Sequence, residues 1–141
     1  MNPASSIKIG IMTCGGEELP QGTLARTAAR LVLEKYRPEH TGNLCFPHFL
    51  SGDEKSRKFA RENPVITLDG CEKICARKSA LRYSGEPASS LMISELLKKW
   101  DEIPCLNRAE LDERGRELAE RIALEVSHKV DLLSQQLNLK G

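Results

Sequence analysis

Two cysteines separated by three residues carry the sharpest chemical signal in this sequence of 141 residues. Cys71 and Cys75 form a C-x3-C pair directly after the turn signal Asp69-Gly70. If a helix begins at Cys71, the two side chains share one face, with their β-carbons about 5–6 Å apart. Tetrahedral zinc, with Zn–S bonds of about 2.3 Å, places its sulfur ligands about 3.8 Å from one another. Two sulfur atoms so placed can chelate one metal ion, although a C-x3-C pair alone is a weak signal.

Two further cysteines complete a tetrahedral set of ligands. Cys14 follows an alternating apolar segment and precedes two glycines, and Cys45 ends a weaker apolar segment. Closed zinc sites take four protein ligands, which leaves no position for a water molecule and gives no route to hydrolysis. We predict a Zn²⁺-binding protein with a structural or metal-handling role, whose ligands are Cys14, Cys45, Cys71 and Cys75.

The same thiols also suit a cysteine enzyme, which is the alternative function. The run from Cys71 to Arg77 is C-x5-R, a spacing in which a cysteine attacks a phosphoryl or sulfur centre while an arginine stabilises the oxyanion. Glu72 lies in this loop, which contains no glycine, so phosphate would meet like charge there. A redox disulfide of Cys71 with Cys75 or Cys14 is better supported, because a helix beginning at Cys71 favours a reactive thiolate.

Three other residues leave details of the site open. His48 stands three residues after Cys45 and could replace a thiolate ligand, although we favour a solvated loop histidine. Cys105 is either an exchangeable fifth ligand or resolving thiol, or a half-buried loop cysteine, and we favour the last interpretation. Asp69 either orients a ligand or forms an Asx turn at the strand exit, and we favour the turn.

Alternating strands and helices must position these cysteines. Apolar alternation and β-branched residues predict four strands, the last of which is ambiguous with a helix, at residues 7–13, 43–46, 65–68 and 90–94. Apolar residues at helical spacing predict four helices. The first is capped by Thr23 and the third begins at Cys71, and together they cover residues 23–37, 53–62, 71–84 and 107–138.

These elements favour a small three-layer α/β fold with an open, mostly parallel sheet of about four strands, either Rossmann-like or flavodoxin-like. Such sheets bind ligands beyond the carboxyl ends of their strands, where the strand order reverses. Cys14, Cys45 and Cys71 each end or follow a different strand, so we expect them to converge at one edge, with the first strand between the other two. The length fits a single domain over residues 1–141, with a core at about 7–105.

The last predicted helix, at residues 107–138, is too long for so small a domain. At 1.5 Å per residue it would extend about 45 Å. The portion after His128 must therefore protrude, break or pack on a partner chain. We predict a homodimer formed through apolar residues of this portion, namely Val130, Leu133 and Leu137.

The composition narrows the classes of function. Lys and Arg number 21 against 20 Asp and Glu, so no basic field is present and nucleic acid is not an expected partner. No apolar run approaches the roughly 18 residues of a membrane span, so no membrane association is expected. The first residues lack the cationic and apolar parts of a secretory signal, and the cysteines are odd in number. We therefore expect a reducing, cytoplasmic location.

The cysteine motifs also resemble those of a known family. They stand in the chain as Ile11-Met-Thr-Cys14-Gly15-Gly16, Leu44-Cys45 and Leu68-Asp69-Gly70-Cys71-Glu-Lys-Ile-Cys75-Ala76. This pattern, over roughly residues 7–105, is similar to that of the DGC-domain family, which is named for its Asp-Gly-Cys. The resemblance implies zinc binding by the same four cysteines, and the family has no settled biochemical function.

Overall fold

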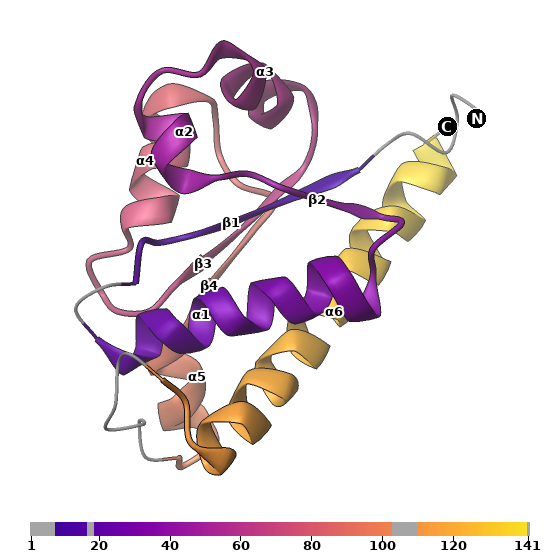
Figure 1. Cartoon of the computed structure of the whole chain (residues 1–141). Coiled ribbons are helices and arrows are strands. Elements are labelled where there is room, and N and C mark those ends of the chain that lie inside the picture. The colour runs from indigo at the N-terminus through magenta and orange to yellow at the C-terminus, as the bar shows by residue number, and fades with distance from the viewer. Residues whose placement is uncertain (1–7, 17–18, 103–109, 141) are drawn as a thin grey trace.

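The structure, a computed structural model, describes residues 8–16, 19–102 and 110–140, with side chains described as far as residue 137. It is an α/β fold around one four-stranded sheet in which every pairing is parallel (Figure 1). The strand order β2-β1-β3-β4 places the first strand between the second and the third, as the sequence predicted. The strands are β1 (Ile9–Thr13), β2 (Thr41–Asn43), β3 (Val65–Asp69) and β4 (Ser89–Met92).

The register of the sheet brings three strand ends to the same edge. Thr13 of β1 lies opposite Leu68 of β3, and Ile11 of β1 lies opposite Asn43 of β2. The ladder continues one residue beyond β1, because the N–H of Cys14 donates to the carbonyl of Leu68 at 3.1 Å. The segments that leave β1, β2 and β3 therefore start at one edge of the sheet, where ligands of parallel sheets bind.

Helices cover both faces of the sheet (Figure 1). One face carries α1 (Pro20–Leu31), its π-helical continuation η2 (Val32–Tyr36), α5 (Ile93–Lys99) and α6 (Glu113–Lys140). The other face carries three shorter helices, α2 (Phe46–Leu50), α3 (Glu54–Glu62) and α4 (Cys75–Tyr83). The predicted three-layer fold with a long C-terminal helix is confirmed.

Each face of the sheet has its own apolar core. Side chains alternate along a strand, so that Ile11 joins the core under α1 and α6, whereas Met12 joins the core under α2 and α4. The first core is by far the larger and includes the fully buried Leu24, Val32, Ile66, Ile122 and Val126. The second is a small cluster consisting of Met12, Leu44, Phe49, Ala60, Val65 and Ala76.

The long C-terminal helix packs along its own chain further than the sequence predicted. Val130 is fully buried against the larger core, and the guanidinium of Arg37 donates to both carboxylate oxygens of Asp131, at 2.7 and 2.8 Å. The expected departure of the helix after His128 is therefore wrong for at least the next turn. Self-association stays a prediction, and of its three residues Leu133 and Leu137 are partly exposed.

Several predicted boundaries are wrong by a few residues. The first helix begins at Pro20, so Thr23 is a buried helical residue and not the N-cap. The third helix, α4, begins at Cys75, which leaves Cys71 in the preceding turn. Pro20 suits the first position of a helix and starts α1, whereas the start of α4 is set by a contact from β3 that is described below.

The remaining differences concern the second strand, the fourth strand and the last helix. The second strand ends at Asn43, before Cys45, and the fourth ends at Met92, where α5 begins. The last helix starts at Glu113, because a carboxylate oxygen of Asp112 accepts the N–H of Gly115 at 2.7 Å. None of the helices in the described part of the chain has the length and apolarity that a bilayer crossing requires.

Candidate metal and thiol site

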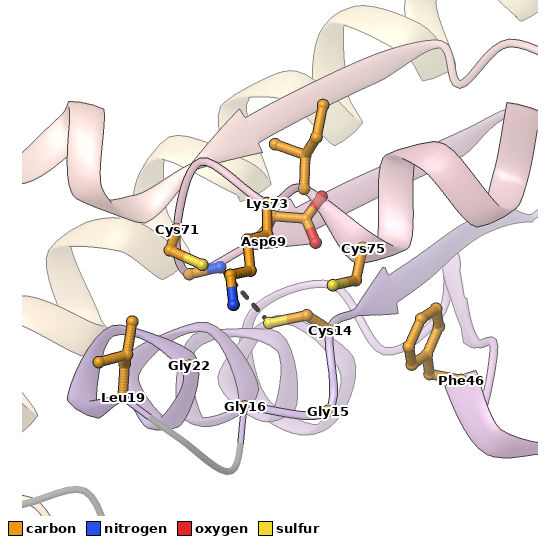
Figure 2. A pocket seen from close by; sticks show the side chains of 12 residues that line it. Cys14, Gly15, Gly16, Leu19, Gly22, Phe46, Asp69, Cys71, Lys73 and Cys75 are labelled. Atoms are coloured by element: carbon orange, nitrogen blue, oxygen red, sulfur yellow. Dashed lines mark hydrogen bonds between the residues drawn. The ribbon is translucent and has the colours of Figure 1, made fainter.

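Three of the four predicted ligands line one pocket at the carboxyl edge of the sheet. Cys14 follows β1, whereas Cys71 and Cys75 lie in and after the turn that follows β3, and the pocket among them has a volume of about 300 Å³. Figure 2 shows the three sulfur atoms turned toward the space between these segments. Cys14 and Cys71 are half-buried, while Cys75 is exposed. The thiol pocket is therefore open to solvent on the side of Cys75.

Cys45, the fourth predicted ligand, lies outside the thiol pocket. It directly precedes α2 and lines an adjoining groove, to which Cys14 also contributes. Phe46 and Gly15 line both cavities, so the thiol pocket and the groove meet at these residues and at Cys14. The structure thus places Cys45 with Cys14 in the groove, and not with the C-x3-C pair in the thiol pocket.

The described residues do not form a finished coordination shell. Among residues 8–16, 19–102 and 110–140, no three His, Cys, Asp or Glu side chains are arranged so that they could hold one ion. The donor chemistry nonetheless fits zinc, because thiolates are preferred zinc ligands and three thiols face one small space. The four-ligand set therefore stays a prediction.

Three glycines hold the thiol pocket together by close backbone contact. A β-carbon on Gly22, in the first turn of α1, would lie 2.2 Å from the α-carbon of Gly16, and one on Gly70 would lie 2.7 Å from the backbone nitrogen of Gly22. Gly16 also has a φ of +68°, which side chains disfavour. The start of α1 is thereby packed against the turns that carry Cys14 and Cys71.

Asp69 determines where α4 begins. Its two carboxylate oxygens accept the backbone N–H groups of Ala76 and Arg77 at 2.8 and 3.1 Å. Ile74, the residue before the helix, has a left-handed φ of 43° and makes no side-chain cap. Asp69, 2% exposed at the end of β3, supplies the missing cap from a distance. The interpretation of Asp69 as an Asx turn at the strand exit is therefore wrong.

Burial makes the Cys14 thiol hard to ionise. Desolvation raises the pKa of Cys14 above its ordinary value, and the negative charges of Asp69 and of the other two thiolates act in the same direction. The N–H of Gly70, 3.4 Å from the Cys14 sulfur, opposes this rise only in part. Burial likewise raises the pKa of Asp69, against the two N–H groups that it accepts. A bound cation would offset both desolvation costs.

The oxyanion arrangement suggested by C-x5-R is not formed in the structure. Arg77 is exposed, contacts Asp69 through its backbone N–H, and does not line the thiol pocket. Lys73 is the one cationic residue among the described residues that line it. Because Cys71 lies in a turn and not at a helix N-terminus, the helix-dipole argument for its reactivity also fails.

The remaining candidates contribute no ligand to the described site. His48 is exposed on α2 and lines neither cavity. Cys105 lies outside the described residues. Gly22 is the positioning residue that the sequence analysis missed. A glycine in the first turn of an otherwise amphipathic helix weakens that helix, and this cost is the sequence signal of a close backbone contact.

Comparison with known proteins gives one match. The family model described as DGC domain matches residues 10–118, so the chain belongs to this family. The matched range includes all three motifs of the site and the start of α6. No match was found among curated proteins or among solved structures.

Proposed function

We propose that this member of the DGC-domain family binds one zinc ion through Cys14, Cys45, Cys71 and Cys75, in a structural or metal-handling role. The observation that supports it best is the convergence of three thiols on one pocket. They come from two segments more than fifty residues apart in the chain. Such convergence at the ligand-binding edge of a parallel sheet is the arrangement that a shared ion requires.

The electrostatics of the thiol pocket favour a cation. Ionised Cys14 would lie close to the thiolates of Cys71 and Cys75 and to the buried carboxylate of Asp69, and all three raise its pKa. If these groups were all ionised without a cation, they would repel one another at a site of reduced solvation. A divalent cation neutralises them and takes the place of the thiol protons. Lys73 at the rim compensates part of the remaining charge.

Cys45 completes the proposed ligand set from the adjoining groove. The groove and the thiol pocket share Cys14 and Phe46, and the proposed ligand set requires the Cys45 thiol to move toward Cys14. Four bound thiolates leave zinc no open position for water, so the ion supplies cross-linking of the strand ends and no hydrolysis. This assignment makes the protein a metal-binding protein and not a hydrolase.

Metal analysis of the protein purified without a metal-affinity tag tests the proposal. We expect about one zinc ion per chain, and a loss of zinc together with a lower melting temperature for Cys75→Ser. Cys105→Ser is the matched control, because it removes a thiol that is not in the proposed set, and it should retain zinc. Equal zinc content and melting temperature in the two variants would overturn the four-ligand assignment.

A thiol redox function is the second candidate, and the exposure of Cys75 supports it. An accessible thiol that shares a pocket with Cys14 and Cys71 can form a disulfide with either of them when an oxidant is present. Metal-free protein that contains a Cys71–Cys75 or Cys14–Cys75 disulfide, detected by mass spectrometry under non-reducing conditions, would favour this function. Zinc-loaded protein in which all five cysteines can be alkylated after chelation would exclude it.

A further inference from the structure

The groove that adjoins the thiol pocket is a second cavity with its own chemistry. It runs between α1, the edge strand β2 with the residues that follow it, and the start of α6. Its volume of about 1070 Å³ exceeds that of the thiol pocket several-fold. Zinc needs no such space, because its ligands close around it at about 2.3 Å. The groove therefore has room for a ligand much larger than a metal ion.

Charge in the groove favours an anion. Among the residues that the structure describes, four cationic and two acidic side chains line the groove: Arg26, Arg30, Lys35 and Arg116, with Glu34 and Glu110. The balance is positive although the whole chain is nearly neutral, with a formal charge of +1. Positive charge concentrated in a concave surface attracts anionic ligands.

Two of these cations are not engaged by other side chains. Arg30 pairs with Glu34 at 3.0 Å, and Lys35 pairs with a carboxylate of α6 at 3.4 Å. Arg26 and Arg116 form no ion pair and no side-chain hydrogen bond with any residue that the structure describes. A guanidinium presents planar donors that match a carboxylate. The groove thus offers two guanidinium groups to a ligand.

The groove is also lined by two thiol groups. Cys14 and Cys45 both line it, beside the apolar Leu44 and Phe46. Both sets of groups belong to one cavity, because Arg26 and Arg116 line the same groove as Cys14 and Cys45. A cavity of about 1070 Å³ is large enough for a ligand of about tripeptide size.

We propose that this groove binds a small anionic thiol, a peptide of about tripeptide size. Its carboxylates pair with Arg26 and Arg116, and its sulfur end lies beside Cys45 and Phe46. The site overlaps the proposed zinc ligand set at Cys14 and Cys45, but its binding energy comes from the arginines and not from the metal. It brings an exogenous thiol to the edge of the cysteine cluster.

Binding of S-methyl-glutathione to the metal-free protein tests this proposal. The methylated sulfur can form neither a disulfide nor a thiolate–metal bond, so the result does not depend on zinc or on redox state. We expect saturable binding that weakens with added salt, together with nuclear Overhauser contacts from the S-methyl group to Phe46. The diethyl ester of the same molecule, which lacks both carboxylates, is the matched ligand and should not bind.

Substitution of individual exposed arginines tests where the probe binds. Arg26→Gln and Arg116→Gln should each lower the affinity for S-methyl-glutathione about fivefold, because each removes one ion pair near the surface. Arg82→Gln is the control, since Arg82 is exposed on α4, on the other face of the sheet, and does not line the groove. Circular dichroism confirms that each variant is folded. Equal affinity of all three variants, equal binding of the ester, or no binding by the native protein would overturn the proposal.

Because the assay uses metal-free protein, its result is separable from that of the proposed function. The purified protein can contain no zinc although the metal-free protein binds S-methyl-glutathione. Conversely, the four cysteines can retain zinc although the probe does not bind. In the first case the groove proposal stands alone, and in the second it is wrong and the zinc proposal is unaffected.

Discussion

The two faces of the sheet are built on different principles. The face under α1, α5 and α6 holds a large apolar core, into which Ile122 and Val126 of the long helix are fully buried. The face under α2, α3 and α4 has only a small cluster around Phe49. Stability on the first face comes from burial of apolar surface, whereas the second face has little of it.

Three of the four proposed ligands lie at the start of segments that lead into the less packed face. Cys45 directly precedes α2, and Cys71 and Cys75 lie in the turn and first residue of the segment that forms α4. The only capping contact of α4 from a side chain in the described structure comes from Asp69, on β3. The proposed zinc ion would cross-link the segments that begin α2 and α4 to the end of β1. It would thereby stabilise the second face, where little apolar surface is buried.

The largest expected effect comes from a cavity in the larger core. Ile122→Ala should lower the free energy of unfolding by about 2–5 kcal/mol, measured by chemical denaturation, because Ile122 is fully buried. Zinc content per folded chain should not change. Leu124→Ala, two residues along α6 and 55% exposed, is the control and should have little effect on stability. A loss of zinc from folded Ile122→Ala would show that the two faces are not independent.

Zinc should stabilise the face of the sheet that α2, α3 and α4 cover. At a free zinc concentration one hundred times its dissociation constant, binding to the folded state alone adds about 2.7 kcal/mol to stability. On removal of zinc, hydrogen exchange should accelerate in α2 and α4 and remain unchanged in the buried part of α6. Uniform acceleration over both faces would contradict the proposed division.

Loss of the Asp69 carboxylate should have a smaller effect, confined to α4. Asp69→Ala leaves the N–H groups of Ala76 and Arg77 without their acceptor and should cost about 1–3 kcal/mol. Asp69→Asn keeps one acceptor oxygen and should restore part of the loss. Amide exchange at residues 76 and 77 separates this positioning role from a role as a metal ligand. Normal protection of these amides in Asp69→Ala would refute the remote cap.

The smallest effect concerns the ion pair that ties α6 to the segment before β2. Arg37 lowers the pKa of Asp131 below its ordinary value of 3.8. The carboxylate therefore contributes stability above pH 3.8, and the contribution is lost as the pH falls through the lower folded-state value. Because the Asp131 side chain is 43% exposed, Asp131→Asn should cost only about 0.2–1 kcal/mol at neutral pH. The difference in free energy of unfolding between Asp131→Asn and the native protein should shrink below pH 4. A difference that grows as the pH falls would contradict the lowered pKa of Asp131.

Local sequence signals predicted the frame of the fold well. The β-branched run of β3 and the alternating isoleucines of β1 gave both central strands, and Asp53 caps α3 by accepting the N–H of Ser56 at 3.1 Å. These features depend on neighbouring residues, which the sequence contains directly. The convergence of strand ends followed from the general geometry of parallel sheets.

The details of the site depend on distant contacts and were missed. A helix starting at Cys71 was a reasonable expectation after Asp69-Gly70, but Asp69 reaches forward to the N–H groups of residues 76 and 77 and starts the helix at Cys75. This geometry forces Ile74, a β-branched residue, into a left-handed conformation that propensity disfavours. The close approach of Gly70 to Gly22 likewise joins segments that no local pattern pairs.

Anomalous scattering at the zinc edge from crystals of the tag-free protein tests the central claim most directly, because it identifies the ion and its ligands together. The account predicts one zinc ion beyond the ends of β1 and β3, with the sulfur atoms of Cys14, Cys45, Cys71 and Cys75 at about 2.3 Å. Crystals with no anomalous peak at this edge after equilibration with zinc, or with a zinc ion that Cys45 does not bind, would contradict it.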